Sequence, residues 1–197
     1  INSAELIKHA SNSFLALKIS YANAVAAVCE ASGANIEEVV TGMGFDKRIG
    51  RPFLNAGLGY GGSCFQKDLA AFIKIAEQLG HDFRLLKEVQ RSNADALERF
   101  LRKLRAELWV LKDKTLGVLG LPFKPNTDDI RSAPAIAIIQ KLLAEQARVR
   151  VYDPQAMDKA RAILPEELGA LAAYNRQPIQ LMGAPRPTVI PGKSGAW

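Results

Sequence analysis

The segment from Gly59 to Asp68, GYGGSCFQKD, contains the residue types most able to do chemistry. Ser63 followed three residues later by Gln66 is a capping-box pattern, which predicts that Cys64 is the first residue of a helix. The free amides and the dipole of a helix N-terminus stabilise a thiolate, so Cys64 is a candidate nucleophile. Asp68 follows one helical turn later on the same face. The alternative is an inert, buried cysteine after a glycine turn, and these residues alone leave both interpretations open.

Two other groups of polar residues are candidates for binding negative charge. Lys8 and Asn12 are one helical turn apart beside an apolar seam, and both side chains can donate hydrogen bonds to one oxyanion. A solvated lysine and an ordinary helical asparagine are the alternative. Arg48, Lys124 and Arg131 lie in predicted loops near glycine or proline, where phosphate ligands often occur and where surface cations are also common.

The glycine-rich run GLGYGG is not a dinucleotide fingerprint, because it lies between two predicted helices and not between a strand and a helix. The predicted βαβ unit begins at Leu116–Gly120, and its first turn lacks GxGxxG. Asp153 ends the second strand, where a ribose-binding acid would lie. The sequence therefore predicts a nucleotide site that does not bind NAD in the usual manner.

A predicted helical part positions the first of these groups. A long helix begins at Asn2 and ends at Gly33, and a short helix follows Asn35, with Glu38 in the capping-box position. A glycine-rich loop over residues 50–62 leads into the helix that carries Cys64. The apolar seam of the first helix consists of Ile7, Ala10, Phe14, Leu17, Tyr21, Ala24 and Val28.

The next predicted helix, with apolar positions from Leu85 to Leu111, would span roughly 40 Å and connect two parts of the molecule. After it, the pattern predicts a buried strand over residues 114–121, a helix over 132–146 capped by Ser132, and a strand over 148–154. The expected fold class is α plus α/β. It comprises an all-helical domain (1–82), a long connecting helix (83–112), a Rossmann-like α/β domain (113–173) and an irregular tail (174–197).

The amino-acid composition restricts the classes of protein to which the chain can belong. The 197 residues are 48% apolar and 23% charged, which is ordinary globular usage. The net charge of +6 comes from 26 basic residues dispersed among 20 acids, which favours a small phosphorylated ligand over nucleic acid. Two cysteines and two histidines without a CxxC predict neither a disulfide scaffold nor a metal site, and favour a cytoplasmic setting. We expect no membrane span, because no apolar run approaches ~20 residues.

Residues 1 to about 165 resemble the UDP-glucose/GDP-mannose dehydrogenase family. The resemblance rests on AELIKHASNSFLALKIS, RIGRPFLNAGLGYGGSCFQKD, GLPFKPNTDDIRSAPA and VRVYDPQAM, and FLNAGLGYGG favours the UDP-glucose branch. It implies NAD-dependent oxidation of a sugar C6 alcohol to a carboxylate, in two hydride transfers through a thiohemiacetal and a thioester. By the same resemblance Cys64 is the nucleophile, Lys8 and Asn12 stabilise the oxyanions, and Asp68 assists the lysine or the water.

The resemblance also implies that residues 1–82 are the central dimerisation and catalytic domain, which forms a homodimer, and that residues 113–173 are an incomplete Rossmann-like domain that binds UDP. It implies ligand contacts as well. Lys67 and Arg131 would lie near NAD, and Arg48 would reach the sugar site of a neighbouring subunit. The residues expected around the sugar and nucleotide of UDP-glucose are Phe53, Leu54, Asn55, Gly57, Gly59, Tyr60, Gly61, Phe123 and Lys124.

The chain also departs from the family pattern. The N-terminal NAD-binding lobe with its GxGxxG is expected to be absent, so the chain alone would be inactive, and a truncated or frameshifted reading frame is our hypothesis for residues 174–197. Two other functions remain open. One is a dehydrogenase for another nucleotide sugar, such as GDP-mannose or a UDP-N-acetylhexosamine. The other is a nucleotide-sugar binding or dimerisation module without turnover.

Overall fold

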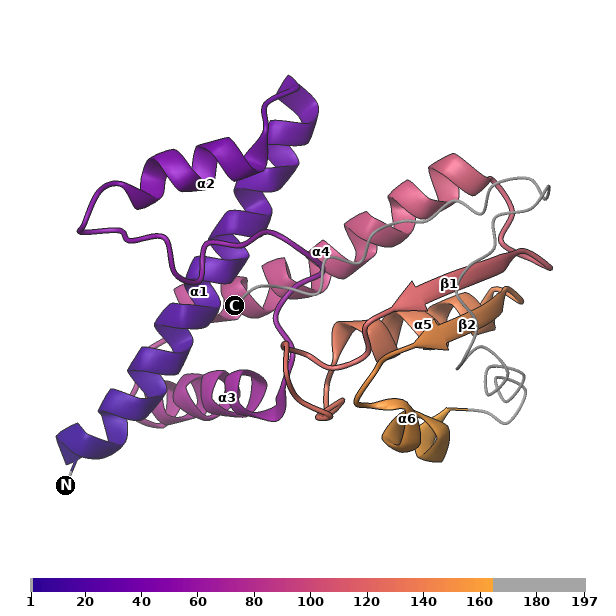
Figure 1. The fold of residues 1–197 in the computed structure, drawn as a ribbon. Coiled ribbons are helices and arrows are strands. Elements are labelled where there is room, and N and C mark those ends of the chain that lie inside the picture. Colours follow the sequence, from indigo (N-terminus) through magenta and orange to yellow (C-terminus); the bar gives the residue numbers. More distant parts are fainter. Residues whose placement is uncertain (1, 165–197) are drawn as a thin grey trace.

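The computed structural model describes residues 2–164 of the chain, apart from the side chain of Asn2. A helical part is followed by a small parallel α/β part, and one long helix packs into both (Figure 1). The expected fold class is therefore confirmed, whereas the predicted tail at 174–197 lies outside the described residues. The helical part consists of α1 (Asn2–Ser32), α2 (Ile36–Gly44), α3 (Ser63–Gln78) and the first half of α4 (Arg84–Leu108).

Helix α1 turns a different face to the core than the sequence predicts. Its buried side consists mainly of small residues, and these allow α3 and α4 to approach closely. The predicted seam is wrong as a core face, because it lies largely in solvent. Ile7, Phe14, Tyr21 and Val28 are 64%, 60%, 53% and 67% exposed. Apolar periodicity identifies a face that needs covering, but not whether the same chain covers it.

Helix α1 is also long and apolar enough over Ser3–Ser32 to cross a membrane by length and composition, which differs from the expectation of no such segment. A helix in the core of a water-exposed domain passes the same test. The inner face of α1 carries the buried polar residues Ser13, Ser20 and Asn23, and Ser20 donates a hydrogen bond to the Val89 carbonyl of α4. These contacts make α1 part of a helical core in this structure.

Helix α4 belongs to two hydrophobic cores. Leu86 and Val89 near its start pack with Ile19, Leu69 and Tyr60 of the helical part. Near its end, a second set of α4 side chains packs under the α/β part. This second core contains Leu101 and Leu104 of α4 together with Ile139 and Leu142 of α5. One rigid helix therefore positions the glycine-rich loop relative to the α/β part.

The α/β part is a βαβ unit, as predicted. Strands β1 (Thr115–Leu119) and β2 (Arg148–Tyr152) are parallel, with Val118 opposite Val151. Helix α5 (Pro134–Ala144) connects them, and α6 (Met157–Ile163) follows β2. The prediction of a buried first strand is wrong for the described residues, because β1 alternates exposed and half-buried positions and Leu119 is 53% exposed. Leu116 and Val118 pack against the second core, and among the described residues the opposite face of β1 stays open to solvent.

The sequence predicts N-caps for α2 and α5, and the structure confirms one of them. Asn35 caps α2, and its side chain accepts a hydrogen bond from the Glu37 amide at 3.0 Å, as the pattern predicts. Ser132 does not cap α5. The N-cap is Ala133, and Pro134 is the first helical residue, where its fixed φ suits the helix. Ser132 instead takes a positive φ of 52° in the preceding turn.

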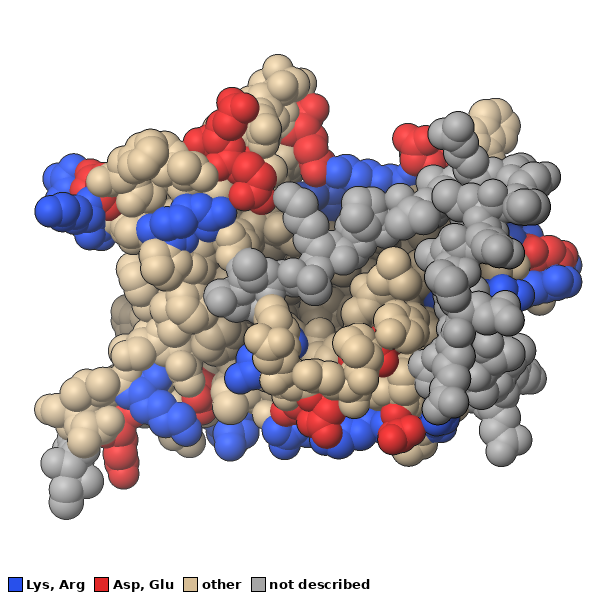
Figure 2. Space-filling model, in the orientation of Figure 1, with Lys and Arg blue, Asp and Glu red and all other residues tan. Residues whose placement is uncertain are grey.

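Charged side chains of both signs are interspersed over the visible face in Figure 2, as the dispersed charge predicts. Several pairs connect α4 to its neighbours. Lys103 and Arg99 pair with Glu30 of α1, and Lys141 of α5 donates to Glu98 at 2.6 Å. These ion pairs help to fix how the helices align with one another, and each contributes little to the free energy of folding.

Candidate active site

Cys64 is a free, exposed cysteine in the first turn of α3. The predicted capping box is wrong: the N-cap is Gly62, without a side-chain hydrogen bond, and Ser63 is already helical. Gly62 takes φ 83°, a conformation natural to glycine, and this starts the helix one residue earlier than predicted. Cys64 is therefore the second helical residue. It stays close to the unpaired amides, which is the property that matters for a nucleophile.

The buried carboxylate of Asp68 lies one turn after Cys64 and joins α3 to α1. Its side chain is 2% exposed. Asn12 Nδ2 donates to Asp68 Oδ2 at 2.6 Å, and Lys8 Nζ lies 3.7 Å from Asp68 Oδ1. The lysine side chain is 65% exposed and so remains accessible to a ligand. The structure thus brings together Lys8, Asn12 and Asp68, three of the four residues with expected catalytic roles, and the fourth, Cys64, lies one turn before Asp68 on α3.

The glycine-rich loop is fastened to α4 by Asn93, a residue that no sequence motif singled out. Asn93 Oδ1 accepts from the Tyr60 amide at 2.7 Å, and its Nδ2 donates to the Tyr60 carbonyl at 3.1 Å. A Cβ at Gly59 would lie 2.7 Å from that Oδ1, so only glycine fits there with this clamp in place. The only local signal for Asn93 was an amide on an otherwise apolar helix face.

The loop residues expected around the sugar fall into two groups. Leu54 and Tyr60 are 2% and 3% exposed, so their side chains are packed in the cores and offer a ligand only their backbone. Phe53 is half-buried at a positive φ of 65°, and Asn55 Oδ1 accepts from Arg51 at 2.6 Å. The Gly57 amide donates to Asn23 Oδ1 of α1 at 2.7 Å. The loop is thus held at several points.

Burial of the Tyr60 phenol raises its pKa to about 12, from an ordinary value of 10.0. Because the folded pKa lies above the unfolded one, this group's contribution to stability is full below pH ~10 and is lost as the pH rises toward 12. A spectrophotometric titration of the wild-type chain is therefore expected to show a tyrosine that ionises near pH 12, and Tyr60→Phe should remove this late component. A late component that survives in Tyr60→Phe would contradict this assignment.

The two parts of the molecule meet where the loop enters α3. A Cβ at Gly61 would lie 2.6 Å from both Pro134 Cδ and the Ser132 carbonyl oxygen, and one at Gly62 would lie 2.8 Å from the Phe123 ring. The loop backbone therefore lies directly against the turn that precedes α5. Phe123, which is expected to contact the nucleotide, is next to the start of the Cys64 helix.

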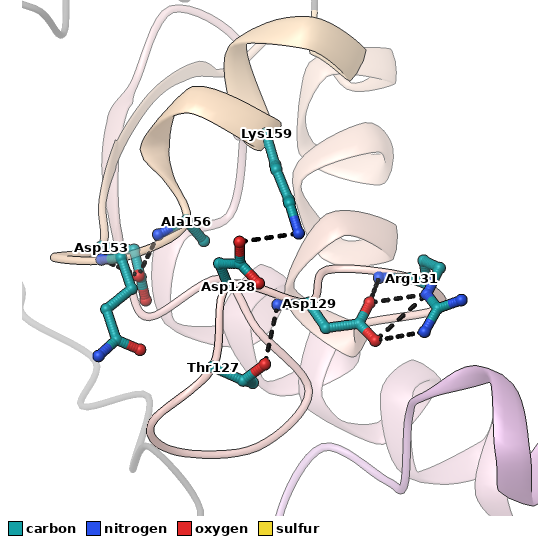
Figure 3. A network of polar contacts seen from close by, with 8 residues as sticks. Thr127, Asp128, Asp129, Arg131, Asp153, Ala156 and Lys159 are labelled. Carbon is teal, nitrogen blue, oxygen red and sulfur yellow. Dashed lines mark hydrogen bonds and ion pairs between the residues drawn. The ribbon is translucent and has the colours of Figure 1, made fainter.

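Lys124 and Arg131 supply positive charge near this junction. Lys124 Nζ lies 5.4 Å from the centre of the Phe123 ring. Arg131 forms a forked pair with Asp129, with a shortest contact of 2.7 Å (Figure 3). These bonds lower the pKa of Asp129 to about 2 and raise the pKa of Arg131, to which the nearby charge of Cys64 adds a smaller increase. Arg131 is therefore within electrostatic reach of the candidate nucleophile.

Two other predicted site residues, Arg48 and Lys67, make no described contact with this junction. Arg48 is exposed and forms a forked pair with Asp46 in the segment after α2, which lies on the opposite side of α1 from the start of α3 in Figure 1. This pair lowers the pKa of Asp46. Lys67 lies on α3, three residues after Cys64, with an exposed side chain. Within residues 2–164, no group of three His, Cys, Asp or Glu side chains could hold a metal ion.

Asp153 is not available to a ribose. Its carboxylate is buried and accepts from the Gln155 and Ala156 amides at 2.8 Å each and from the Leu121 amide at 3.2 Å. It thus holds the end of β1 to the start of α6, beside the 127–131 turn (Figure 3). The interpretation as a ribose ligand is wrong, because three backbone donors occupy the carboxylate.

A cavity of about 650 Å³ opens between α3, α4 and α5 behind the junction. No charged side chain lines it, and its polar lining residues are Tyr60, Gln66, Gln90, Asn93, Ser132 and Gln140. A diphosphate would therefore depend on cations outside this cavity, of which Lys124 and Arg131 are the nearest candidates in the α/β part.

The helical part and the α/β part of the chain each match a domain of one known protein family. Residues 2–95 match the central domain of the UDP-glucose/GDP-mannose dehydrogenase family, and residues 117–178 match the UDP binding domain of the same family. The chain is 52% identical over 166 residues to the UDP-glucose 6-dehydrogenase YwqF of Bacillus subtilis, a match that covers 84% of this chain and 38% of that protein. The chain thus spans well under half the length of this relative.

Solved structures show the same arrangement. A UDP-glucose dehydrogenase from the archaeon Pyrobaculum islandicum superimposes with a TM-score of 0.82 at 47% identity, over 84% of this chain and 38% of that one. A UDP-D-ManNAc dehydrogenase from Pyrococcus horikoshii gives a TM-score of 0.66 at 28% identity, over 77% and 36%.

Proposed function

Because the chain belongs to the UDP-glucose/GDP-mannose dehydrogenase family, we propose that it provides the nucleophile and substrate loop of a UDP-glucose 6-dehydrogenase. The product would be UDP-glucuronate, formed in the cytoplasm. One observation carries the proposal: an exposed thiol in the first turn of α3 shares its helix with a buried carboxylate that contacts both an amide and an accessible lysine.

The chemistry that these side chains support is acyl transfer at C6. The Cys64 thiolate adds to the aldehyde carbon, a C–S bond forms, and the carbonyl oxygen becomes an alkoxide. Lys8 and the second N–H of Asn12 donate to that oxygen, since Asp68 occupies only one amide proton. After oxidation to the thioester, water adds to the carbonyl carbon, the C–S bond breaks, and the carboxylate and thiolate separate.

The family is NAD-dependent, and NAD would accept the two hydrides. The described residues do not fit a dinucleotide site of the usual kind. The turn after β1 lacks the glycine fingerprint, and backbone amides occupy the acid that ends β2. The roles of Lys67 and Arg131 toward NAD therefore stay predictions, and the steps that the described side chains can perform are those of Cys64 and its neighbours.

UDP-glucose is expected to stabilise the chain against thermal unfolding, by about 2.7 kcal/mol at a ligand concentration of 100 times Kd. Lys124→Ala should lose most of this stabilisation because it removes the ammonium that we place on the diphosphate. Lys112→Ala, which removes another exposed lysine, in the segment between α4 and β1, is the matched control. Equal stabilisation of both variants would contradict the proposed site, and stronger stabilisation by GDP-mannose would favour the alternative substrate.

A non-catalytic binding module would predict the same stabilisation without thiol chemistry. Cys29 is buried and Cys64 is exposed, so alkylation reports on Cys64. The proposed enzyme fragment should be alkylated once, at Cys64, with protection by UDP-glucose. Cys64→Ser should keep binding and lose the adduct. An unreactive Cys64 in the wild-type chain would instead favour the module.

We also propose that α1 forms a homodimer interface. Ile7, Phe14, Tyr21 and Val28 recur every seven residues, so they form one line along the helix, and each is more than half exposed. An apolar stripe of this length on a lone helix face calls for a partner helix.

The double change Phe14→Glu and Tyr21→Glu is expected to convert a dimer to a monomer, because it places four like charges in a two-fold interface. Sedimentation velocity measures this directly. Phe45→Glu alters a still more exposed aromatic residue off the stripe and should leave the dimer intact. A wild-type chain that sediments as a monomer at all concentrations would exclude the interface.

A further inference from the structure

Two buried atoms of complementary chemistry face each other between α1 and α3. His9 Nδ1 and Asp68 Oδ1 are 3.7 Å apart, and neither has a hydrogen-bond partner among the described residues. The other carboxylate oxygen, Oδ2, already accepts from Asn12. An unpaired carboxylate oxygen in a side chain that is 2% exposed is costly, so Oδ1 is the oxygen that still needs a donor.

Two side chains are close enough to supply that donor, and they differ in burial. Lys8 Nζ also lies 3.7 Å from Oδ1, but its side chain is 65% exposed and its ammonium can be solvated. The His9 side chain is 20% exposed and stacks on Phe72, with ring centroids 6.2 Å apart and an angle of 29° between the planes. The stacked ring holds Nδ1 toward the carboxylate.

The protonation of His9 follows from this geometry. A carboxylate oxygen only accepts, and an unprotonated Nδ1 would direct its lone pair at that oxygen. Nδ1 must therefore carry a proton, and in the neutral form of the ring this leaves Nε2 unprotonated. A movement of roughly 0.5 Å brings the pair within the usual N–H···O range.

We propose that His9 is a positioning residue for Asp68. Its Nδ1–H donates to Oδ1 while Asn12 donates to Oδ2, so both oxygens of the buried carboxylate are satisfied without Lys8. The Lys8 ammonium is then available to the oxygen at the reacting carbon. This last role of Lys8 rests on the proposed function, whereas the hydrogen bond between His9 and Asp68 does not.

The nitrogen shifts of His9 in a ¹⁵N-labelled sample test the proposal directly. The chain has only two histidines, and the exposed His81 serves as an internal reference that His81→Gln identifies. Above about pH 8, where an ordinary histidine is neutral, His9 is expected to show a protonated Nδ1 and an unprotonated Nε2. An unprotonated Nδ1 in the wild-type chain would overturn the proposal.

Asp68→Asn provides a sharper outcome. Asn12 continues to face the oxygen of the new amide, so the NH₂ group points at His9, which must now accept. The His9 tautomer is therefore expected to switch from Nδ1–H to Nε2–H. Lys8→Met is the matched control and should leave Nδ1–H in place, whereas a switch in that variant, or none in Asp68→Asn, would refute the assignment. These readouts need neither UDP-glucose nor turnover, so they stay independent of the ligand experiments.

Discussion

Replacing Gly61 by alanine is expected to destabilise the chain by about 3 kcal/mol and to abolish stabilisation by UDP-glucose. The new Cβ would lie 2.6 Å from the Ser132 carbonyl oxygen and from Pro134 Cδ. Neither atom is the end of a flexible side chain, so the loop and the turn before α5 must separate. That separation would also move Phe123 from the start of the Cys64 helix.

Urea unfolding followed by circular dichroism measures the change at Gly61, and the ligand titration measures its effect on binding. Gly57→Ala in the same loop is the control, because a Cβ there meets nothing within 4 Å. It should alter the free energy of unfolding by less than about 0.5 kcal/mol. If the two alanine variants unfold at the same urea concentration, the close contact between loop and turn does not exist in solution.

Asp153→Ala is expected to cost about 3 kcal/mol or more, because it leaves three backbone amides without their acceptor. Asp153→Asn should fall between the alanine variant and the wild type. Its remaining oxygen can still accept from the Gln155 and Ala156 amides, and only the Leu121 amide then lacks a partner.

Asp158→Ala makes the same substitution five residues later, where the carboxylate is 96% exposed and pairs only with Arg161 among the described residues. It should change stability by less than about 0.5 kcal/mol, as exposed ion pairs usually do. Chemical denaturation of all three variants gives the order. An alanine variant at 153 as stable as the one at 158 would show that the buried carboxylate is dispensable.

Local patterns predicted the elements well. The spacing of Cys64 and Asp68 placed them one turn apart on one helix, and the change of period after α4 identified the βαβ unit. Helix starts were less predictable. Serine was expected to cap both α3 and α5, yet Gly62 and Ala133 hold those positions, because backbone conformation at the turn decides where the first helical residue lies.

Contacts between distant segments could not be predicted from spacing. Asn93 lies 33 residues from the Tyr60 backbone that it clamps, and His9 lies 59 residues from Asp68. No periodicity relates such residues, because their meeting depends on how three helices pack. The prediction that the apolar seam of α1 faces the core was wrong for a related reason. The helical period of the seam is correct, but periodicity alone does not show which segment, if any, packs on it.

The sharing of α4 between both cores has a consequence for how the molecule melts. A helix of 25 residues with Leu86 in one core and Leu104 in the other ties the free energies of the two cores together. Loss of the α/β core would leave the second half of α4 without its apolar contacts, and helices without tertiary packing are marginal in water. Fraying would then approach Asn93, the residue that holds the glycine-rich loop through the Tyr60 backbone. The two parts are therefore expected to unfold as one cooperative unit, although each has a core of its own.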